Sequence, residues 1–161
     1  MSDINIIQID YTDPQEAADL QLLLNSYAQD PMGGGEPINS ENLRVLPKRL
    51  ADFPTAFSLI AYVNGQPAGL ANCFWGFSTF AAKPLVNIHD FAVRPEFRGI
   101  GLSRKLLEAI EAIAQDKGCC KITLEVLSEN HVAMAAYRRF GFGGYQLTPE
   151  VGQAVFWQKK L

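Results

Sequence analysis

Residues 84–110 read "PLVNIHDFAVRPEFRGIGLSRKLLEAI", which begins with the composition of a strand and ends with that of a helix. The alternating apolar residues predict a strand over Pro84–Val93. A stripe at helical spacing predicts a helix that runs to about Lys117, with Gly118 as its C-terminal cap. The stripe consists of Leu106, Leu107, Ile110 and Ile113.

The turn between this strand and this helix has the composition of an anion site. A helix start leaves N–H groups unpaired and carries partial positive charge, which suits phosphate. Gly99 and Gly101 let a ligand approach the backbone without meeting a β-carbon. The positively charged guanidinium of Arg98 can bind two phosphate oxygens, and Ser103 adds a hydroxyl. No Walker loop is present, and Arg104 stands where a dinucleotide fingerprint needs its third glycine.

The N-terminal half of the chain is expected to alternate strands and helices. Asp13 and Pro14 have the character of a helix cap and a first helical residue. Pro47 interrupts the pattern of a second helix, and Asn64-Gly65 is a strong signal for a hairpin. The expected elements are strands at 4–9, 56–63 and 67–80, helices from 14 and over 40–50, and a glycine-rich loop over 30–37.

The C-terminal half continues the alternation. The sequence predicts a strand over 121–127, a helix over 129–140, and two closing strands over 144–147 and 154–160. The resulting order, β-α-α-β-β-β-α-β-α-β-β, is that of a mixed α/β domain. A parallel pair of strands is expected around the helix that begins at Gly101.

Composition narrows the class of protein. The 161 residues fit one domain, and the net charge of −3 does not favour nucleic-acid binding through a general basic field. The start of the chain lacks the pattern of a signal peptide, and no apolar run approaches the ~18 residues that span a bilayer. Three cysteines without zinc-ligand spacing indicate reduced thiols, a cytoplasmic protein and no metal site.

Two stretches resemble motifs of a known family. Arg98–Ser103, "RGIGLS", resembles the acyl-CoA signature R/Q-x-x-G-x-G/A of the GNAT superfamily of N-acetyltransferases, with Ser103 replacing the last glycine or alanine. Residues 130–142, "NHVAMAAYRRFGF", are similar to its second motif, N-x-x-A-x-x-x-Y-x-x-x-G-F, at every named position. The resemblance implies one GNAT domain over 1–161, with helices on both faces of a twisted, mostly antiparallel sheet of about seven strands that contains a splayed parallel pair.

The resemblance also implies a donor, acetyl-CoA, as co-substrate. Its pantetheine arm would pair with the last residues of the strand before the turn, and its pyrophosphate would lie on the N–H groups of the turn. Asn130 would reach the pantetheine arm. The residues implied in acetyl-CoA binding are Phe91, Ala92, Val93, Arg98, Gly99, Ile100, Gly101, Leu102, Ser103, Arg104, Asn130 and Ala133.

Acetyl transfer to an amine needs a proton acceptor and a proton donor. A free alkyl amine has a pKa near ~10.4, so it must lose a proton before it attacks the thioester. The resemblance assigns protonation of the departing thiolate to Tyr137. The acceptor is His89, Asp90 or a water chain, and strand alternation predicts that the two side chains point to opposite faces. The "HDF" stretch resembles the diamine and polyamine acetyltransferase branch, in which a glutamate commonly stands at the position of His89.

The sequence therefore predicts an N-acetyltransferase that works by direct attack in a ternary complex, with a small-molecule primary amine as acceptor. Two alternatives stay open. The acceptor is a protein lysine or N-terminus, or the chain is a non-catalytic sensor that binds acyl-CoA. Neither nucleic acid nor a membrane is an expected partner. The resemblance implies a possible homodimer, since dimers are common in the family that the chain resembles.

Overall fold

The computed structural model describes residues 1–161, and its contacts divide the chain into two compact units, Met1–Leu127 and Ser128–Leu161. Each unit is described by itself. No helix in the structure combines the length and the apolar character that crossing a bilayer requires. The expectation of one domain over the whole chain stays a prediction.

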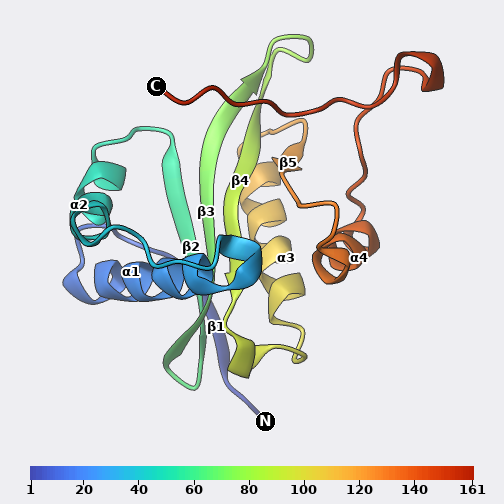
Figure 1. The fold of residues 1–161 in the computed structure, drawn as a ribbon. Helices are drawn as coiled ribbons and strands as arrows, with labels where there is room; N and C mark the ends of the chain where they lie inside the picture. Colours follow the sequence, from blue (N-terminus) through green and yellow to red (C-terminus); the bar gives the residue numbers. More distant parts are fainter. The chain divides into compact units, whose positions relative to one another are not determined.

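The first unit is built on a five-stranded sheet whose strands follow the order of the chain (Figure 1). Neighbouring strands are antiparallel except the last pair, β4 and β5, which are parallel as predicted. The strands are β1 (Ile4–Gln8), β2 (Ala56–Val63), β3 (Gln66–Ser78), β4 (Lys83–Val93) and β5 (Ile122–Leu124). Asn64 and Gly65 join β2 to β3 with φ angles of +50° and +78°, which confirms the predicted hairpin.

Helices cover both faces of this sheet, as predicted. They are α1 (Pro14–Gln29), α2 (Ser40–Ala51) and α3 (Leu102–Asp116), with the short 3₁₀ helices η1 (Pro31–Gly33) and η2 (Pro95–Phe97) between elements. A β-carbon on Gly69 would meet Leu102 and Leu106 of α3, whereas Leu70 belongs to the cluster that packs against α1. Because successive residues of a strand point to opposite faces, α1 and α3 lie on opposite sides of β3.

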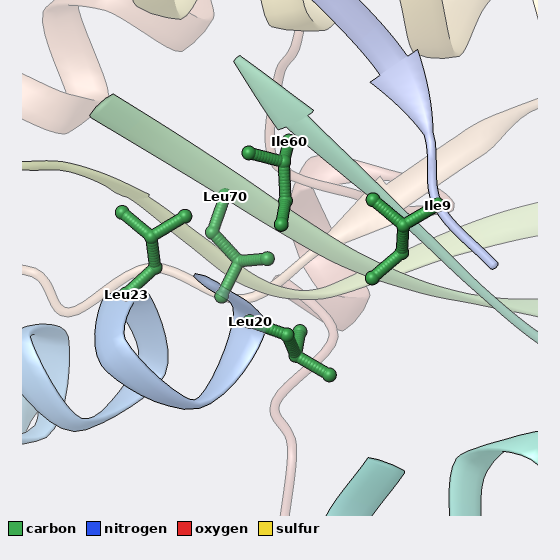
Figure 2. Packing of buried hydrophobic residues seen from close by; sticks show 5 residues of the cluster. All are labelled: Ile9, Leu20, Leu23, Ile60 and Leu70. Carbon is green, nitrogen blue, oxygen red and sulfur yellow. The ribbon is translucent and has the colours of Figure 1, made fainter. Parts of the chain in front are cut away.

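The core on the α1 side is a cluster of buried aliphatic residues (Figure 2). Leu20 and Leu23 project from α1 toward the sheet, where Ile60 of β2 and Leu70 of β3 meet them. Asp13 caps the start of α1, since its side chain accepts hydrogen bonds from the amides of Gln15 and Glu16. The cap and the apolar face together fix α1 across the strands that carry the site.

Helix α2 runs through Pro47 without a break, although proline removes one backbone donor from the helix. The carbonyl that loses its partner is that of Leu43, four residues earlier. Gln21 of α1 replaces the missing donor, because its side-chain amide donates to the Leu43 carbonyl over 2.8 Å. The interruption expected from the sequence is therefore offset by a neighbouring helix.

The second unit contains one α-helix, α4 (His131–Phe140), and the short 3₁₀ helix η3 (Pro149–Val151). The closing strands predicted over 144–147 and 154–160 do not form, because Gln146 and Gln153 make only an isolated bridge. Gly143 precedes the first of these segments and Gly144 begins it, and glycine weakens a strand because it loses the most conformational freedom on folding. The sheet therefore has five strands instead of about seven, and β5 is shorter than the predicted 121–127.

Candidate functional site

Strands β4 and β5 are joined by a short parallel ladder that covers only the middle of β4. Only three residue pairs join them, from Val86–Ile122 to Ile88–Leu124. Asn87 reinforces the ladder by donating a hydrogen bond to the Thr123 hydroxyl over 3.0 Å. β5 ends at Leu124, so beyond Ile88 no strand pairs with this edge of β4, which continues to Val93. The last residues of β4, Phe91, Ala92 and Val93, lie past this point.

The turn after β4 delivers an uncapped helix start. Gly99 and Gly101 adopt φ angles of +80° and +81°, a conformation that L-residues rarely adopt, and a β-carbon on either would meet no atom within 4 Å. No side chain caps α3, and the first amide that bonds back into the helix is that of Lys105 to the Gly101 carbonyl. The amides of Leu102, Ser103 and Arg104 therefore belong to the unpaired donors of a helix start, beside the exposed Ile100.

Three side chains of the turn have partners within the protein. Leu102 is 2% exposed and packs into the core, whereas Arg104 pairs with Glu108 on the surface over 2.9 Å. Arg98 is held by acceptors of the protein: its guanidinium donates to the Val93 carbonyl over 3.0 Å and to the Asp30 carboxylate over 3.1 Å. The structure thus places Arg98 between the end of β4 and the loop after α1.

Asp30 is the residue that links the α1–α2 loop to this turn. The Met32 amide and the Arg98 side chain donate to its carboxylate and lower the pKa of Asp30 below its usual value of 3.8. A cleft of about 260 Å³ opens beside this pair, between the end of α1 and the end of β4. Its lining includes Tyr27, Asp30, Ala92, Arg94 and Arg98.

A β-bulge in the middle of β4 changes which residues share a face. Asn72 of β3 pairs with Asp90, but the next residue, Cys73, pairs with Ile88, so His89 is the extra residue of β4. The His89 ring lies against Phe74 with its centroid 5.6 Å away, and Asn72 donates to the Asp90 carboxylate over 3.0 Å.

Asn72 and Phe74 are two residues apart on β3, so they share a face. Their partners His89 and Asp90 therefore lie on that face too, the one covered by α1. The prediction that these two side chains point to opposite faces is wrong, because regular alternation does not hold across a bulge.

Three polar residues of the site were missed in the sequence. Tyr11, Ser58 and Asn72 form a hydrogen-bonded chain that ends at Asp90. The available signal was a polar residue inside each of two apolar strands, at Ser58 in "AFSLIAYV" and Asn72 in "LANCF". Only the register, which places Ser58 opposite Asn72, joins the two signals.

The remaining predicted residues lie on α4 in the second unit. Asn130 is the N-cap of α4, because its side chain accepts a hydrogen bond from the Ala133 amide over 3.3 Å. Tyr137 follows two helical turns later on nearly the same face and is 9% exposed, with the Phe142 ring centroid 5.9 Å from its own. The motif spacing thus corresponds to one helix with a capped start.

The geometry of the first unit suits a long ligand with an anionic group. An uncapped helix start offers donors to phosphate, and the adjoining strand β4 has an unpaired edge beyond the point where β5 ends. At the bulge, a histidine and a carboxylate lie on one face, where a proton can be accepted.

Comparison with known proteins agrees with this geometry. The model of the acetyltransferase (GNAT) family matches residues 20–142. A thialysine N-epsilon-acetyltransferase of Caenorhabditis elegans is 35% identical over 78 residues, which cover 48% of this chain and 48% of that protein. The matched stretch thus spans about half the length of this relative.

Solved structures share the fold. The aminoglycoside N-acetyltransferase AAC(6')-Iy in complex with CoA superposes with a TM-score of 0.75 at 18% identity, over 100% of this chain and 97% of that chain. A probable acetyltransferase superposes with a TM-score of 0.81 at 18% identity, over 98% of this chain and 99% of that chain. At this level of identity the likeness concerns the fold.

Proposed function

Because the chain belongs to the acetyltransferase (GNAT) family, we propose that it is an enzyme that transfers an acetyl group from acetyl-CoA to a primary amine. The observation that carries the proposal is the uncapped start of α3, with Gly99 and Gly101 both in the left-handed region, directly after a strand whose last residues have an unpaired edge. Both features are what a phosphate-bearing, extended donor requires.

The donor is proposed to lie along the end of β4 and the turn. Its pantetheine arm would extend the sheet at Ala92 and Val93, and its pyrophosphate would accept hydrogen bonds from the amides at the start of α3. Arg98 already contacts Val93 and Asp30, so it would bind phosphate only by exchanging the Asp30 carboxylate for a donor oxygen. Ser103 adds a hydroxyl beside these amides.

The chemistry requires an amine to lose a proton, attack the thioester carbonyl and expel a thiolate. His89 is the proposed proton acceptor, directly or through water, because it is exposed and lies at the bulge, directly after the last residue of β4 that pairs with β5. Tyr137 is the proposed donor to the leaving thiolate, on the strength of the family motif that it completes. Asn130 would contact the pantetheine arm from the same helix.

The acceptor is proposed to be a small molecule. The relatives named above are a thialysine N-epsilon-acetyltransferase and an aminoglycoside N-acetyltransferase, and both names denote transfer to amines outside proteins. The two units are proposed to form one acetyltransferase domain. The reduced thiols expected of the three cysteines support a cytoplasmic enzyme, and the family resemblance supports homodimers.

The experiment is release of CoA thiol from acetyl-CoA over a panel of thialysine, diaminobutane, an aminoglycoside and a lysine peptide. Turnover with a small amine supports the proposal. Turnover with the peptide and with no small amine would contradict a small-molecule acceptor and indicate a protein acceptor instead. Saturable acetyl-CoA binding without thiol release across the panel would instead identify an acyl-CoA sensor.

A further inference from the structure

A chain of three hydrogen bonds crosses the α1 side of the sheet and ends at the β4 bulge. The Tyr11 hydroxyl lies 2.7 Å from Ser58 Oγ, Ser58 Oγ lies 2.6 Å from Asn72 Oδ1, and Asn72 Nδ2 lies 3.0 Å from Asp90 Oδ2. Ser58 is 1% exposed and Asn72 is 4% exposed. Four side chains from four segments are thus joined, the middle two buried and the outer two half-buried.

The donors of this chain all point one way. An ionised carboxylate only accepts, so the Asn72 amide nitrogen donates to Asp90 and its oxygen faces Ser58. Ser58 has one proton and donates it to that oxygen, so the Tyr11 hydroxyl must donate to Ser58. A single arrangement satisfies every group, which fixes the amide of Asn72 and, through it, the Asp90 carboxylate.

Apolar residues at these two strand positions would fill the core without the cost of burying polar groups. Ser58 and Asn72 face each other across β2 and β3, among neighbours such as Leu59, Ile60 and Leu70 that are 1% exposed or less. We therefore attribute the buried polar pair to the group that it holds in place. What it holds is Asp90, at the strand residue that follows the extra residue of the bulge.

The Asp90 carboxylate is half-buried and has one oxygen atom that accepts no side-chain hydrogen bond. Asn72 contacts only its Oδ2 atom, and the carboxylate forms no ion pair, whereas Asp30 is neutralised by Arg98. The negative charge of Asp90 also acts on Tyr27, which lines the cleft. Burial raises the pKa of the Tyr27 hydroxyl, and the negative charges of Asp90 and Asp30 raise it further. An ammonium group would find its counter-charge at Asp90.

We propose that Asn72 and Ser58 are positioning residues that hold the Asp90 carboxylate in one orientation, so that its Oδ1 atom receives the ammonium group of the acceptor amine. The inference rests on the proposed function and adds to it the residue that recognises the acceptor. His89, on the same face, would then take the proton from the amine that Asp90 has aligned.

The test compares steady-state kinetics of the Asn72→Leu variant with wild type, using acetyl-CoA and the panel amine that wild type turns over fastest. Leucine keeps the volume but removes both hydrogen bonds. The KM for the amine should rise about tenfold, while kcat and the KM for acetyl-CoA stay within about twofold. Ser58→Ala, a smaller change, should raise the KM for the amine by about threefold, since Asn72 then loses only the donor that fixes its amide.

The matched control is Tyr62→Phe. Tyr62 also donates a partly buried hydrogen bond to a carboxylate, that of Asp19 over 2.8 Å, but it lies on β2, which β3 separates from the bulge of β4. It should lower stability without changing the KM for the amine. A purely structural role of Asn72 would likewise reduce the amount of active enzyme and leave KM unchanged, and that result overturns the inference.

A double-mutant cycle with Asp90→Asn decides whether Asn72 acts through Asp90. Asp90→Asn alone should raise the KM for the amine, and adding Asn72→Leu should raise it little further. Multiplicative effects of the two substitutions contradict the inference. If wild type turns over no amine, the proposed function fails and the inference with it; wild-type turnover with unchanged KM in Asn72→Leu overturns the inference alone.

Discussion

Gly101 and Gly118 stand at opposite ends of α3 with nearly the same backbone angle, φ +81° and +74°, and a β-carbon on either would meet no atom within 4 Å. Substitution by alanine should therefore strain both positions equally, by about 1–2 kcal/mol. Only Gly101 lies at the proposed pyrophosphate site.

This pair gives the first prediction. Gly101→Ala should raise the dissociation constant of CoA by about tenfold, because the first-turn amides no longer hold their orientation, whereas Gly118→Ala should leave it unchanged. Calorimetric titration with CoA measures the affinity, and urea unfolding measures the shared loss of stability. Equal affinities in the two variants would place the phosphate elsewhere.

The second prediction concerns the pairing of Gln21 with the carbonyl of Leu43. Gln21→Met should lower the free energy of unfolding by about 1 kcal/mol, since it removes the donor that replaces the missing amide of Pro47. In a Pro47→Ala background an amide is restored at position 47, so the same change should cost less. Urea unfolding of the four proteins measures the coupling, and additive losses would mean that Gln21 does not compensate for proline.

The third prediction concerns acid stability. The Met32 amide and Arg98 lower the pKa of Asp30 in the folded state, so its contribution is present above the usual value of 3.8 and is lost as the pH falls through the lowered value. Asp30→Asn should cost no more than about 1 kcal/mol at neutral pH, because the ion pair is solvent-accessible. The difference should shrink from about pH 5 to about pH 2, and a difference that grows toward acid would reverse the sign of the linkage.

The fourth prediction tests the proton donor. Tyr137→Phe should lower kcat by about a hundredfold with little change in either KM, because it removes the hydroxyl that is the proposed proton donor to the thiolate. Tyr145→Phe is the control, since Tyr145 is 62% exposed in the same unit and should keep full activity. An unchanged kcat for Tyr137→Phe would remove this residue from the chemistry.

The fifth prediction concerns thiol reactivity. Burial, with a smaller contribution from the charge of Asp90, raises the pKa of the Cys73 thiol to about 12, whereas Cys120 is exposed. Iodoacetamide at neutral pH should therefore modify Cys120 in the native protein and reach Cys73 only after unfolding. Peptide mass spectrometry identifies the modified cysteine, and native labelling of Cys73 would show that this part of β3 opens readily.

The sequence predicted those parts of the fold that depend on local chemistry. Asp13 as a cap, Asn64-Gly65 as a hairpin turn and Gly118 as a helix end are each decided by a few adjacent residues, and the structure has all three. The β4–turn–α3 segment was predicted for the same reason, because its glycines and its apolar stripe are contiguous.

What the sequence did not predict depends on partners far along the chain. Helix α2 passes Pro47 because Gln21 lies beside it, and His89 shares a face with Asp90 because β3 and β4 differ by one residue in register. The closing strands were expected from composition alone, but residues of strand character form a strand only where a second segment pairs with them.

The bulge makes the site depend on how many residues β4 contains as well as on which residues they are. Before the bulge, the even-numbered residues of β4 lie on the α3 side, as Ile88 does opposite Cys73. After the bulge they lie on the α1 side, as Asp90 does opposite Asn72. Parity in the strand is thus inverted at His89. Deletion of one residue of β4 next to the bulge would restore regular alternation, so that His89 and Asp90 would point to opposite faces although both side chains are kept. The number of residues in β4 therefore determines this site as much as their identity does.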